Sequence, residues 1–228
     1  MDETLINSQL EMDGKTYDGW ASLRDAPVKN YKSASLNEKL TLELIRKKLS
    51  KGSIRQVTDS EVIKKLVINP IGVANIDGEK PRLTVGLKIN RVAKKFGAEL
   101  DHIRLLLPTL ADAKFQWSHD IKSCYDIVAI SADSAVMCGF RFNDAFYMAT
   151  ALPFGYVNAP FMVQKAGNQI LRYLRTQKVD VTEYLDDFHC KCRTRQEAEY
   201  SLEKFESAFR KLKIPLSDSK FTGRKVTN

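Results

Sequence analysis

Two adjacent carboxylates are the residues in this chain that most directly suggest chemistry. Asp186 and Asp187 stand between two short segments with the composition of β-strands. Residues typical of strands are frequent over positions 179–184, and apolar residues alternate with polar ones over positions 188–192. This pattern predicts a hairpin with both acids at its tip. Aspartate is also a common turn residue, so the pair alone is better explained as an ordinary turn.

A third acid changes that interpretation. Asp120 ends another strand-like segment, and neighbouring strands would bring three carboxylates together. Such a cluster is repulsive unless divalent cations neutralise it. Oxygen ligands suit Mg²⁺, with Mn²⁺ as the alternative. We therefore expect two metal ions roughly 3.5 to 4 Å apart, one activating a hydroxyl nucleophile and the other stabilising a departing pyrophosphate.

The elements around these acids predict an α+β fold. From residue 115 onward the order is a strand, a hairpin at 137–151, a helix from about Pro160 to 176, the hairpin that carries the acids, and a last helix. Thr194 and Glu197 form a capping box for that helix, which Pro215 ends. The order fits a ferredoxin-like split βαβ sheet with its helices on one face.

The first half of the chain contains smaller elements. Residues 1–34 predict a polar lead-in, and leucines at helical spacing predict a helix over about 36–50, with Ser35 and Glu38 as its capping box. Short β-branched runs over 53–90 predict a hairpin region with the exposed basic tip ANIDGEKPR.

Charge and cysteine content narrow the possible partners and compartment. The 228 residues include 36 Lys and Arg against 28 Asp and Glu, which gives a net charge of +8 and a pI near 9.2. The excess favours a polyanionic partner, although a generally basic surface is the alternative. The four cysteines show no disulfide spacing, and no apolar run suits a signal peptide or membrane span. We expect an intracellular protein, in the cytoplasm or nucleus, with no membrane partner.

His189, Cys190 and Cys192 are close enough in sequence to be considered as metal ligands. Side chains alternate across a strand, so His189 would point away from both cysteines. The pattern favours core cysteines.

Several motifs together resemble reverse transcriptases of retroelements. The motifs are YLDD at 184–187, LPFGYVNAP at 152–160 and HDIKSCYDIVAI at 119–130, with GSIRQV, INPIGVANIDGEKPRLTVGLKIN and LKIPLSDSKFTG outside them. Each is modest alone, but their order and spacing over roughly residues 35–223 are specific. The LPFG motif and the residues around Lys220 are more similar to those of retrotransposons than to those of retroviruses.

The resemblance implies the fingers and palm of a right-hand polymerase. Fingers would span 35–114 with a contribution from 137–151, and palm would span 115–136 and 152–223, followed by a tail at 224–228. We expect the thumb and ribonuclease H domains of the family to be absent from these residues. The implied activity is RNA-directed DNA polymerisation on an RNA or DNA template-primer with dNTPs, and a second chain would supply thumb functions.

The family also implies roles for the acids. Asp120 and Asp186 would bind both metals, Asp187 would complete the triad, and the backbone carbonyl of Ile121 would be a further ligand. Lys220 matches a lysine proposed as general acid to pyrophosphate, with a surface lysine as an equally weighted alternative.

Other matched positions would form the nucleotide site. Tyr125 matches the aromatic gate under the sugar, with core packing as the alternative. The amides of Ser123 and Cys124 would face the triphosphate. Phe154 and Gly155 match the turn of the nucleotide pocket, with an ordinary loop leading to a helix as the alternative. On the fingers, Arg82 would clamp the triphosphate with Lys80 nearby, since guanidinium suits bidentate phosphate contact.

Departures from the family pattern leave a second hypothesis open. Asn75 and Ile76 stand where the family has basic residues at the fingers tip, and Val85 and Leu87 replace a common acid and arginine. These changes remove charge around a triphosphate. The alternative is a catalytically degenerate, retroelement-derived module that binds nucleic acid or protein. The three acids favour an enzyme, because clustered acids are a liability without catalysis.

Overall fold

The computed structural model describes residues 9–12, 15–18, 23–78, 80–97 and 114–217. The chain divides into two compact units. The first comprises Met1–Lys95 with Tyr125–Ala159, and the second comprises Phe96–Cys124 with Pro160–Asn228. Each unit is therefore built from two separate stretches of sequence. The boundaries given above for fingers and palm stay a prediction.

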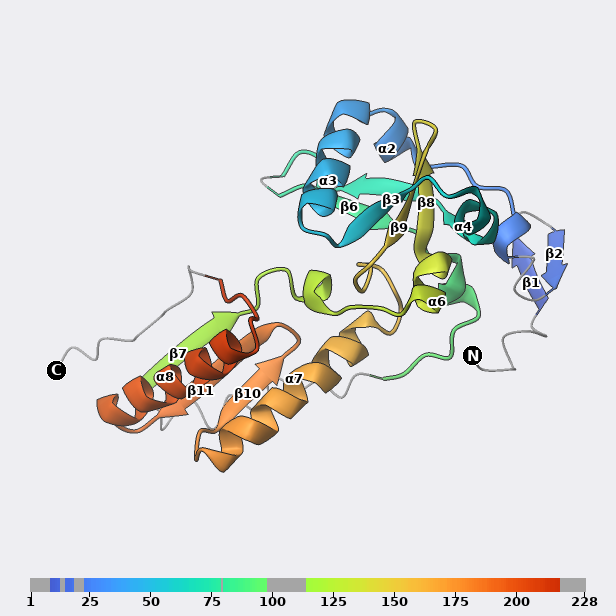
Figure 1. Cartoon of the computed structure of the whole chain (residues 1–228). Helices are drawn as coiled ribbons and strands as arrows, with labels where there is room; N and C mark the ends of the chain where they lie inside the picture. Colours follow the sequence, from blue (N-terminus) through green and yellow to red (C-terminus); the bar gives the residue numbers. More distant parts are fainter. Residues whose placement is uncertain (1–8, 13–14, 19–22, 79, 98–113, 218–228) are drawn as a thin grey trace. The chain divides into compact units, whose positions relative to one another are not determined.

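The second unit contains a three-stranded antiparallel sheet in the order β10-β11-β7. Its elements are β7 (Phe115–Asp120), α7 (Ala159–Thr176), β10 (Val181–Tyr184), β11 (Asp187–Cys192) and α8 (Arg195–Lys211). β11 lies between β7 and β10, which gives the split βαβ arrangement (Figure 1). The predicted α+β class, the strand ending at Asp120 and the hairpin over 181–192 are confirmed.

One face of this sheet packs against α8, which lies across β7 and β11 (Figure 1). Phe188 of β11 is fully buried and contacts both Phe205 and Phe209 of α8, with ring centroids 5.3 Å apart in each pair. Trp117 of β7 is buried beside them and donates from Nε1 to the hydroxyl of Ser201 at 2.8 Å. These aromatic contacts fix α8 on the sheet. α8 itself begins at the predicted capping box of Thr194 and Glu197.

The cysteines of β11 belong to this buried face. Cys190 and Cys192 are buried with their sulfur atoms 3.8 Å apart, and burial raises the pKa of the Cys190 thiol to about 12. His189 lies on the opposite face, where its Nε2 is 3.3 Å from Oε1 of Gln116. The prediction of core cysteines is confirmed, since all four cysteines are buried.

The first unit has a four-stranded sheet in the order β3-β9-β8-β4 and a separate β5-β6 hairpin. The strands are β3 (Ile54–Val57), β4 (Ile68–Asn69), β5 (Ile71–Ala74), β6 (Arg82–Val85), β8 (Gly139–Phe142) and β9 (Ala145–Ala149). The helices are α2 (Lys32–Ser35), α3 (Glu38–Ser50), α4 (Ser60–Lys65), α6 (Ala132–Ala135) and the 3₁₀ turns η2 (Lys88–Arg91), η3 (Cys124–Ile127) and η4 (Val136–Cys138). Both predicted hairpins of this region are confirmed. A further hairpin, β1 (Gln9–Met12) with β2 (Lys15–Asp18), lies within the predicted lead-in.

The helix predicted over 36–50 is present as α3, but the capping box at Ser35 is wrong. Ser35 is the last residue of the short helix α2, and its hydroxyl bonds the carbonyl of Lys32. Asn37 occupies the N-cap of α3 without a side-chain cap bond, and Glu38 instead accepts a hydrogen bond from Asn143. The short helix α2, which the sequence pattern did not predict, thus contains the serine that was expected to cap α3.

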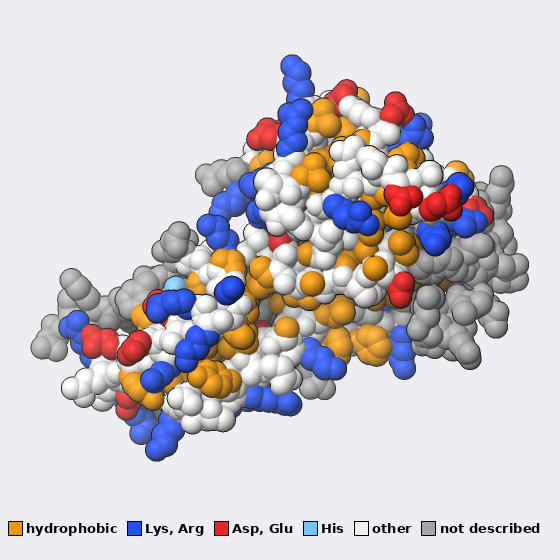
Figure 2. Space-filling model, in the orientation of Figure 1, with side chains coloured by type: hydrophobic (Ala, Val, Ile, Leu, Met, Phe, Trp, Pro, Cys, Tyr) orange, Lys and Arg blue, Asp and Glu red, His pale blue; other side chains and the backbone are white. Residues whose placement is uncertain are grey.

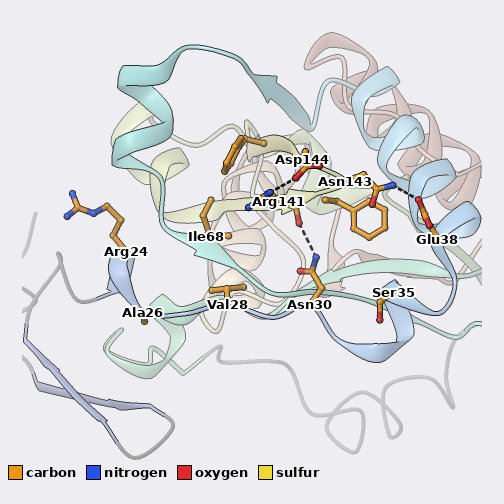
Figure 3. A pocket seen from close by; sticks show the side chains of 12 residues that line it. Arg24, Ala26, Val28, Asn30, Ser35, Glu38, Ile68, Arg141, Asn143 and Asp144 are labelled. Carbon is orange, nitrogen blue, oxygen red and sulfur yellow. Dashed lines mark hydrogen bonds and ion pairs between the residues drawn. The ribbon is translucent and has the colours of Figure 1, made fainter.

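The N-terminal segment crosses the β8–β9 hairpin along a groove of about 640 Å³ (Figure 3). Asn30 donates from Nδ2 to the carbonyl of Arg141 at 3.0 Å. Arg141 also pairs with Asp144 at the hairpin tip. Because these polar groups are satisfied by one another, we interpret the groove as the seam that holds residues 24–38 to the hairpin.

A buried lysine holds the backbone segment that precedes α2 in place. Lys88 is 5% exposed, and its ammonium donates to the carbonyls of Leu23 and Ala26 at 2.9 and 2.7 Å. Desolvation, with a smaller effect of Arg91, lowers the pKa of Lys88 from 10.5 to about 8. Its backbone N–H donates to buried Asn69, whose amide bonds three carbonyls.

Lys88 should make the stability of the protein rise with pH in a defined window. Between pH 8 and 10.5 the unfolded chain holds a proton on Lys88 that the folded chain has released, so unfolding becomes less favourable as pH rises. In urea titrations across this window, wild type should gain roughly 2 to 3 kcal/mol relative to Lys88→Met. Exposed Lys29→Met is the control and should follow wild type. Parallel curves for wild type and Lys88→Met would contradict the assignment.

Candidate active site

The register of the second unit places two predicted metal ligands opposite each other. Asp120 of β7 pairs directly with Asp187 of β11. The next residue, Ile121, donates its N–H to the carbonyl of Asp186 at 2.9 Å, while the carbonyl of Asp120 accepts from the N–H of Ser217 at 2.9 Å. Asp120 and Asp187 are therefore a non-hydrogen-bonded pair, in which opposite side chains share a face and come closest. That face is the one away from α8.

The third acid lies in the turn of the hairpin. Tyr184 pairs with Asp187, which leaves Leu185 and Asp186 as a two-residue turn. Leu185 has a φ of 60°, a conformation that is costly for a branched residue. Such strain is on the order of 1 to 3 kcal/mol and persists where surrounding contacts impose it. The turn thus holds Asp186 directly beside the Asp120–Asp187 pair.

Backbone hydrogen bonds brace the end of β7 from both sides. The bond from Ile121 to Asp186 ties it to the hairpin tip. On the other side, Lys122 donates to the carbonyl of Pro215 and Ile121 bridges Leu216. Beyond this point Ser123 adopts a φ of 58° and Cys124 is buried. The brace fixes where Asp120 lies, while the roles of the Ile121 carbonyl and of the Ser123 and Cys124 amides stay predictions.

The donor set at this end of the sheet suits a hard cation. Two carboxylates share one face and a third adjoins them, and carboxylate oxygen is the ligand that Mg²⁺ prefers. Among the described residues, no three His, Cys, Asp or Glu side chains gather closely enough to hold an ion by themselves. Mg²⁺ commonly uses one or two carboxylates and completes its shell with substrate phosphates and water. The residues fit that mode of binding better than a closed protein cage.

A buried glutamate lies behind the hairpin, and it was not anticipated from the sequence. Glu183 of β10 is 3% exposed and is the cross-strand partner of Phe188, so it points to the helix-covered face. There it meets α7 at Gly167, where a Cβ atom would lie 1.7 Å from Oε1 of Glu183. Both helices therefore cover the face opposite the acids, as predicted. Glycine at 167 lets the backbone of α7 approach the β10–β11 hairpin.

Three residues predicted for the nucleotide pocket form one cluster in the first unit. The rings of Tyr125 and Phe154 meet edge to face with centroids 5.7 Å apart. The guanidinium carbon of Arg82 lies 5.8 Å from the centroid of Phe154, within range of a cation–π contact. Arg82 and Phe154 are also exposed. The cluster thus offers a cation and two aromatic rings at one surface.

The turn that carries Phe154 depends on two residues with defined geometry. Gly155 has a φ of 105°, and a Cβ there would lie 3.0 Å from the carbonyl of Val85, so a side chain is disfavoured. Asn90 spans the turn by donating to the carbonyl of Gly155 at 2.7 Å and accepting from the N–H of Val157 at 2.9 Å. Sequence reasoning identified Gly155 but missed Asn90.

A second unpredicted contact supports Tyr125. The neighbouring Asp126 is 12% exposed and pairs with Lys48 at 2.5 Å and with Lys51 at 3.3 Å, both from the end of α3. Because the three groups join sequence-distant segments, the ion pairs help to hold the Tyr125 segment against α3.

The backbone conformation at the fingers tip gives a reason for one departure from the family pattern, the asparagine at position 75. Asn75 has a φ of 57°, a conformation that asparagine tolerates better than most residues, and its amide donates to the carbonyl of Lys80 at 3.3 Å. Ile76 and Lys80 are exposed. Leu87 is 3% exposed within the core, so its apolar character is structural. Lys220, the predicted general acid, lies outside the described residues.

The split βαβ sheet with carboxylates at a braced hairpin tip has the architecture of a polymerase palm. The chain belongs to the reverse transcriptase (RNA-dependent DNA polymerase) family, whose model matches residues 45–226. This identifies the family that the motifs indicated.

Solved foamy virus enzymes share the fold. The chain is 20% identical to a foamy viral protease-reverse transcriptase in complex with double-stranded DNA, with a TM-score of 0.69 over 84% of this chain and 32% of that one. A second such complex with double-stranded DNA gives 20% identity and a TM-score of 0.69 over 90% of this chain and 41% of that one. The enzyme with an RNA/DNA hybrid gives 18% and 0.67, over 86% and 24%. The chain thus spans less than half of these proteins.

A search of curated proteins found no match. In the part of the chain that the structure describes, no helix has the length and apolar character of a membrane span.

Gly167→Ala should destabilise the protein even though alanine favours helices by about 1 kcal/mol over glycine. The added methyl group collides with the Glu183 carboxylate, which is 3% exposed and therefore has little room to move, and overpacking of this kind costs about 1 to 3 kcal/mol. Urea unfolding should therefore show a net loss for Gly167→Ala. In a Glu183→Ala background, which removes the colliding carboxylate, the same change should be neutral or stabilising. An equal effect in both backgrounds would show that the contact does not limit residue 167.

Proposed function

We propose that the chain carries the fingers and palm of an RNA-directed DNA polymerase. It would extend a primer with dNTPs on an RNA or DNA template. The observation that carries the proposal is the pairing of Asp120 with Asp187 beside the turn that holds Asp186. A structural turn needs no third acid on a neighbouring strand, whereas nucleotidyl transfer does.

The acids would hold divalent metal at the end of the sheet. Asp120 and Asp186 would bind both ions and Asp187 would complete the set, with Mg²⁺ as the natural ion and Mn²⁺ as a substitute. Bound metal would supply activation of the primer hydroxyl and charge stabilisation of the leaving pyrophosphate. The protein contributes rigidity, because backbone bonds to Asp186 and Ser217 brace β7 and Glu183 supports the hairpin from behind.

The cluster in the first unit would receive the nucleotide. Arg82 is exposed and lies over Phe154, so its guanidinium is oriented while its N–H groups can contact a triphosphate. Tyr125 stands edge-on to Phe154 and would support the sugar. Lys80 adds positive charge at the fingers tip, and Lys220 would protonate pyrophosphate.

The nucleic acid bound by the protein would be a duplex of template and primer. The foamy virus enzymes that share the fold are described in complexes with double-stranded DNA and an RNA/DNA hybrid, and the net charge of +8 suits either polyanion. Thumb functions would come from protein outside the matched region or from a second chain. The LPFG form supports a retrotransposon origin.

A degenerate module that binds without turnover is the second candidate. Its support is the pair of uncharged residues Asn75 and Ile76 at the fingers tip, which leaves fewer cations for a triphosphate. A lost charge-assisted contact would weaken nucleotide binding by roughly tenfold or more. That weakness is compatible with slow synthesis as well as with none, so activity must be measured.

Primer extension on an RNA template tests the proposal directly. Wild type with Mg²⁺ or Mn²⁺ should extend the primer, and Asp186→Asn should reduce the rate by roughly 100-fold or more, since charge stabilisation at the reacting groups is lost. Asp180→Asn is the matched control, because Asp180 is exposed at the start of the same hairpin.

Metal binding provides a second measurement that does not need turnover. Millimolar Mg²⁺ should raise the Tm of wild type, and the rise should be smaller in Asp120→Asn/Asp186→Asn. Absence of extension at any dNTP concentration, even with a thumb from a related polymerase fused to the chain, would favour the degenerate module.

Tyr125 should determine sugar selectivity by steric exclusion. A ring beneath the sugar leaves no room for a 2′-hydroxyl, so Tyr125→Val should admit ribonucleotides while Tyr125→Phe keeps the wild-type preference. The measurement is the ratio of kcat/KM for dNTP to that for rNTP in primer extension. An unchanged ratio in an active Tyr125→Val protein would contradict this role.

A further inference from the structure

The outer surface of α7 differs in charge from that of its neighbour. The 18 residues of α7 include Lys165, Arg172 and Arg175 but no Asp or Glu. α8, which covers the same face of the sheet, has four basic and four acidic residues, among them the Arg195–Glu199 ion pair. Balanced charge is what an ordinary solvated helix shows. The excess on α7 therefore needs another explanation.

Two of the three cations of α7 lie on one stripe together with exposed apolar groups. The stripe consists of Met162, Lys165, Gln169, Arg172, Tyr173 and Thr176, which are all exposed and recur at helical spacing. Met162 is 41% and Tyr173 46% exposed. Figure 2 shows blue and orange side chains along the edge of the second unit that α7 forms. The opposite side of the helix, with Gly167, faces the sheet.

Neither stripe cation is neutralised within the described part of the protein. No ion pair there involves Lys165 or Arg172, whereas Arg175, off the stripe, lies 4.0 Å from Asp180. Lys165 instead lies 5.8 Å from the ring of Phe161. The two cations are about 10 Å apart along the axis, which matches about three phosphate steps of a stacked strand. Tyr173, next to Arg172, offers a ring on which an unpaired base can stack.

We infer that this stripe of α7 is a second nucleic-acid site, which binds a single strand. Lys165 and Arg172 contact phosphates of that strand, and Tyr173 stacks on one of its bases. Because α7 covers the face of the sheet away from Asp120 and Asp187, the bound strand is not the primer end at those acids. The site goes beyond the proposed polymerase function and does not require turnover.

Fluorescence anisotropy with labelled oligo(dT) and oligo(U) of about 20 nucleotides tests the site. Lys165→Gln/Arg172→Gln should weaken binding about tenfold and reduce the slope of log affinity against log salt by about 1.4, or 0.7 for each phosphate released. Arg195→Gln/Lys211→Gln removes the same charge from α8 and should bind nearly as wild type. Equal losses in both double variants would reduce the effect to net charge and overturn the inference, as would no loss in the α7 variant.

Variants of Tyr173 test independently where the nucleic-acid strand binds. Tyr173→Leu should weaken binding severalfold while Tyr173→Phe retains it, because stacking needs the ring and not the hydroxyl. Photo-cross-linking with an oligonucleotide that contains 5-iododeoxyuridine should label the peptide around Tyr173. Cross-links confined to other peptides would overturn the site.

The polymerase proposal is tested separately in the same preparation. Asp120→Asn/Asp186→Asn leaves the α7 stripe intact and should not weaken binding of the oligonucleotides. If extension fails but α7 binding and cross-linking persist, only the polymerase proposal falls. If extension proceeds and the stripe variants bind as wild type, only this inference falls.

Discussion

The non-hydrogen-bonded pairing of Asp120 with Asp187 is the constraint on which the site depends. A shift of one residue in the β7–β11 register would turn one of the two carboxylates into the face packed by Phe188 and Phe205. That face is apolar, so the register is set by burial as much as by the acids. The core thus positions two like charges that would otherwise move apart, and the strained turn at Leu185 adds the third.

In both units, neighbouring residues hold the predicted functional residues in position. In the second unit, Gly167 admits the Glu183 carboxylate close to the backbone of α7. In the first, Asn90 and Gly155 hold the turn of Phe154, and Lys48 of α3 and Lys51 just after it hold Asp126. Asp120 and Asp186 are half-buried and Asp187 is exposed, whereas Glu183, which supports their hairpin, is 3% exposed. This division is expected where a site must be both accessible and rigid.

Local patterns predicted the elements well and their supporting contacts poorly. Period-two alternation over 188–192 and the Thr194 capping box were sufficient for the hairpin and for α8, because those signals depend on neighbours in sequence. In the sequence, Glu183 looks like an ordinary strand residue. Its burial against Gly167 arises only when α7 packs on β10. Asn75 was read as missing charge, whereas its positive φ gives a conformational reason for asparagine. The capping box at Ser35 failed because the short helix α2 had no periodic signal of its own.

The split topology of the palm sheet has a consequence for synthesis on the ribosome. β7 ends at residue 120, but its partner β11 begins at residue 187, so the strand emerges long before it can pair. At about 5 to 20 residues per second, the ribosome takes several seconds to make the intervening chain. During that interval β7, with Trp117, exposes apolar surface and an unpaired edge, the features that invite misassociation of nascent chains. Slow elongation between α7 and β11 would lengthen this vulnerable period, so codon usage there should affect yield more than codon usage after α8.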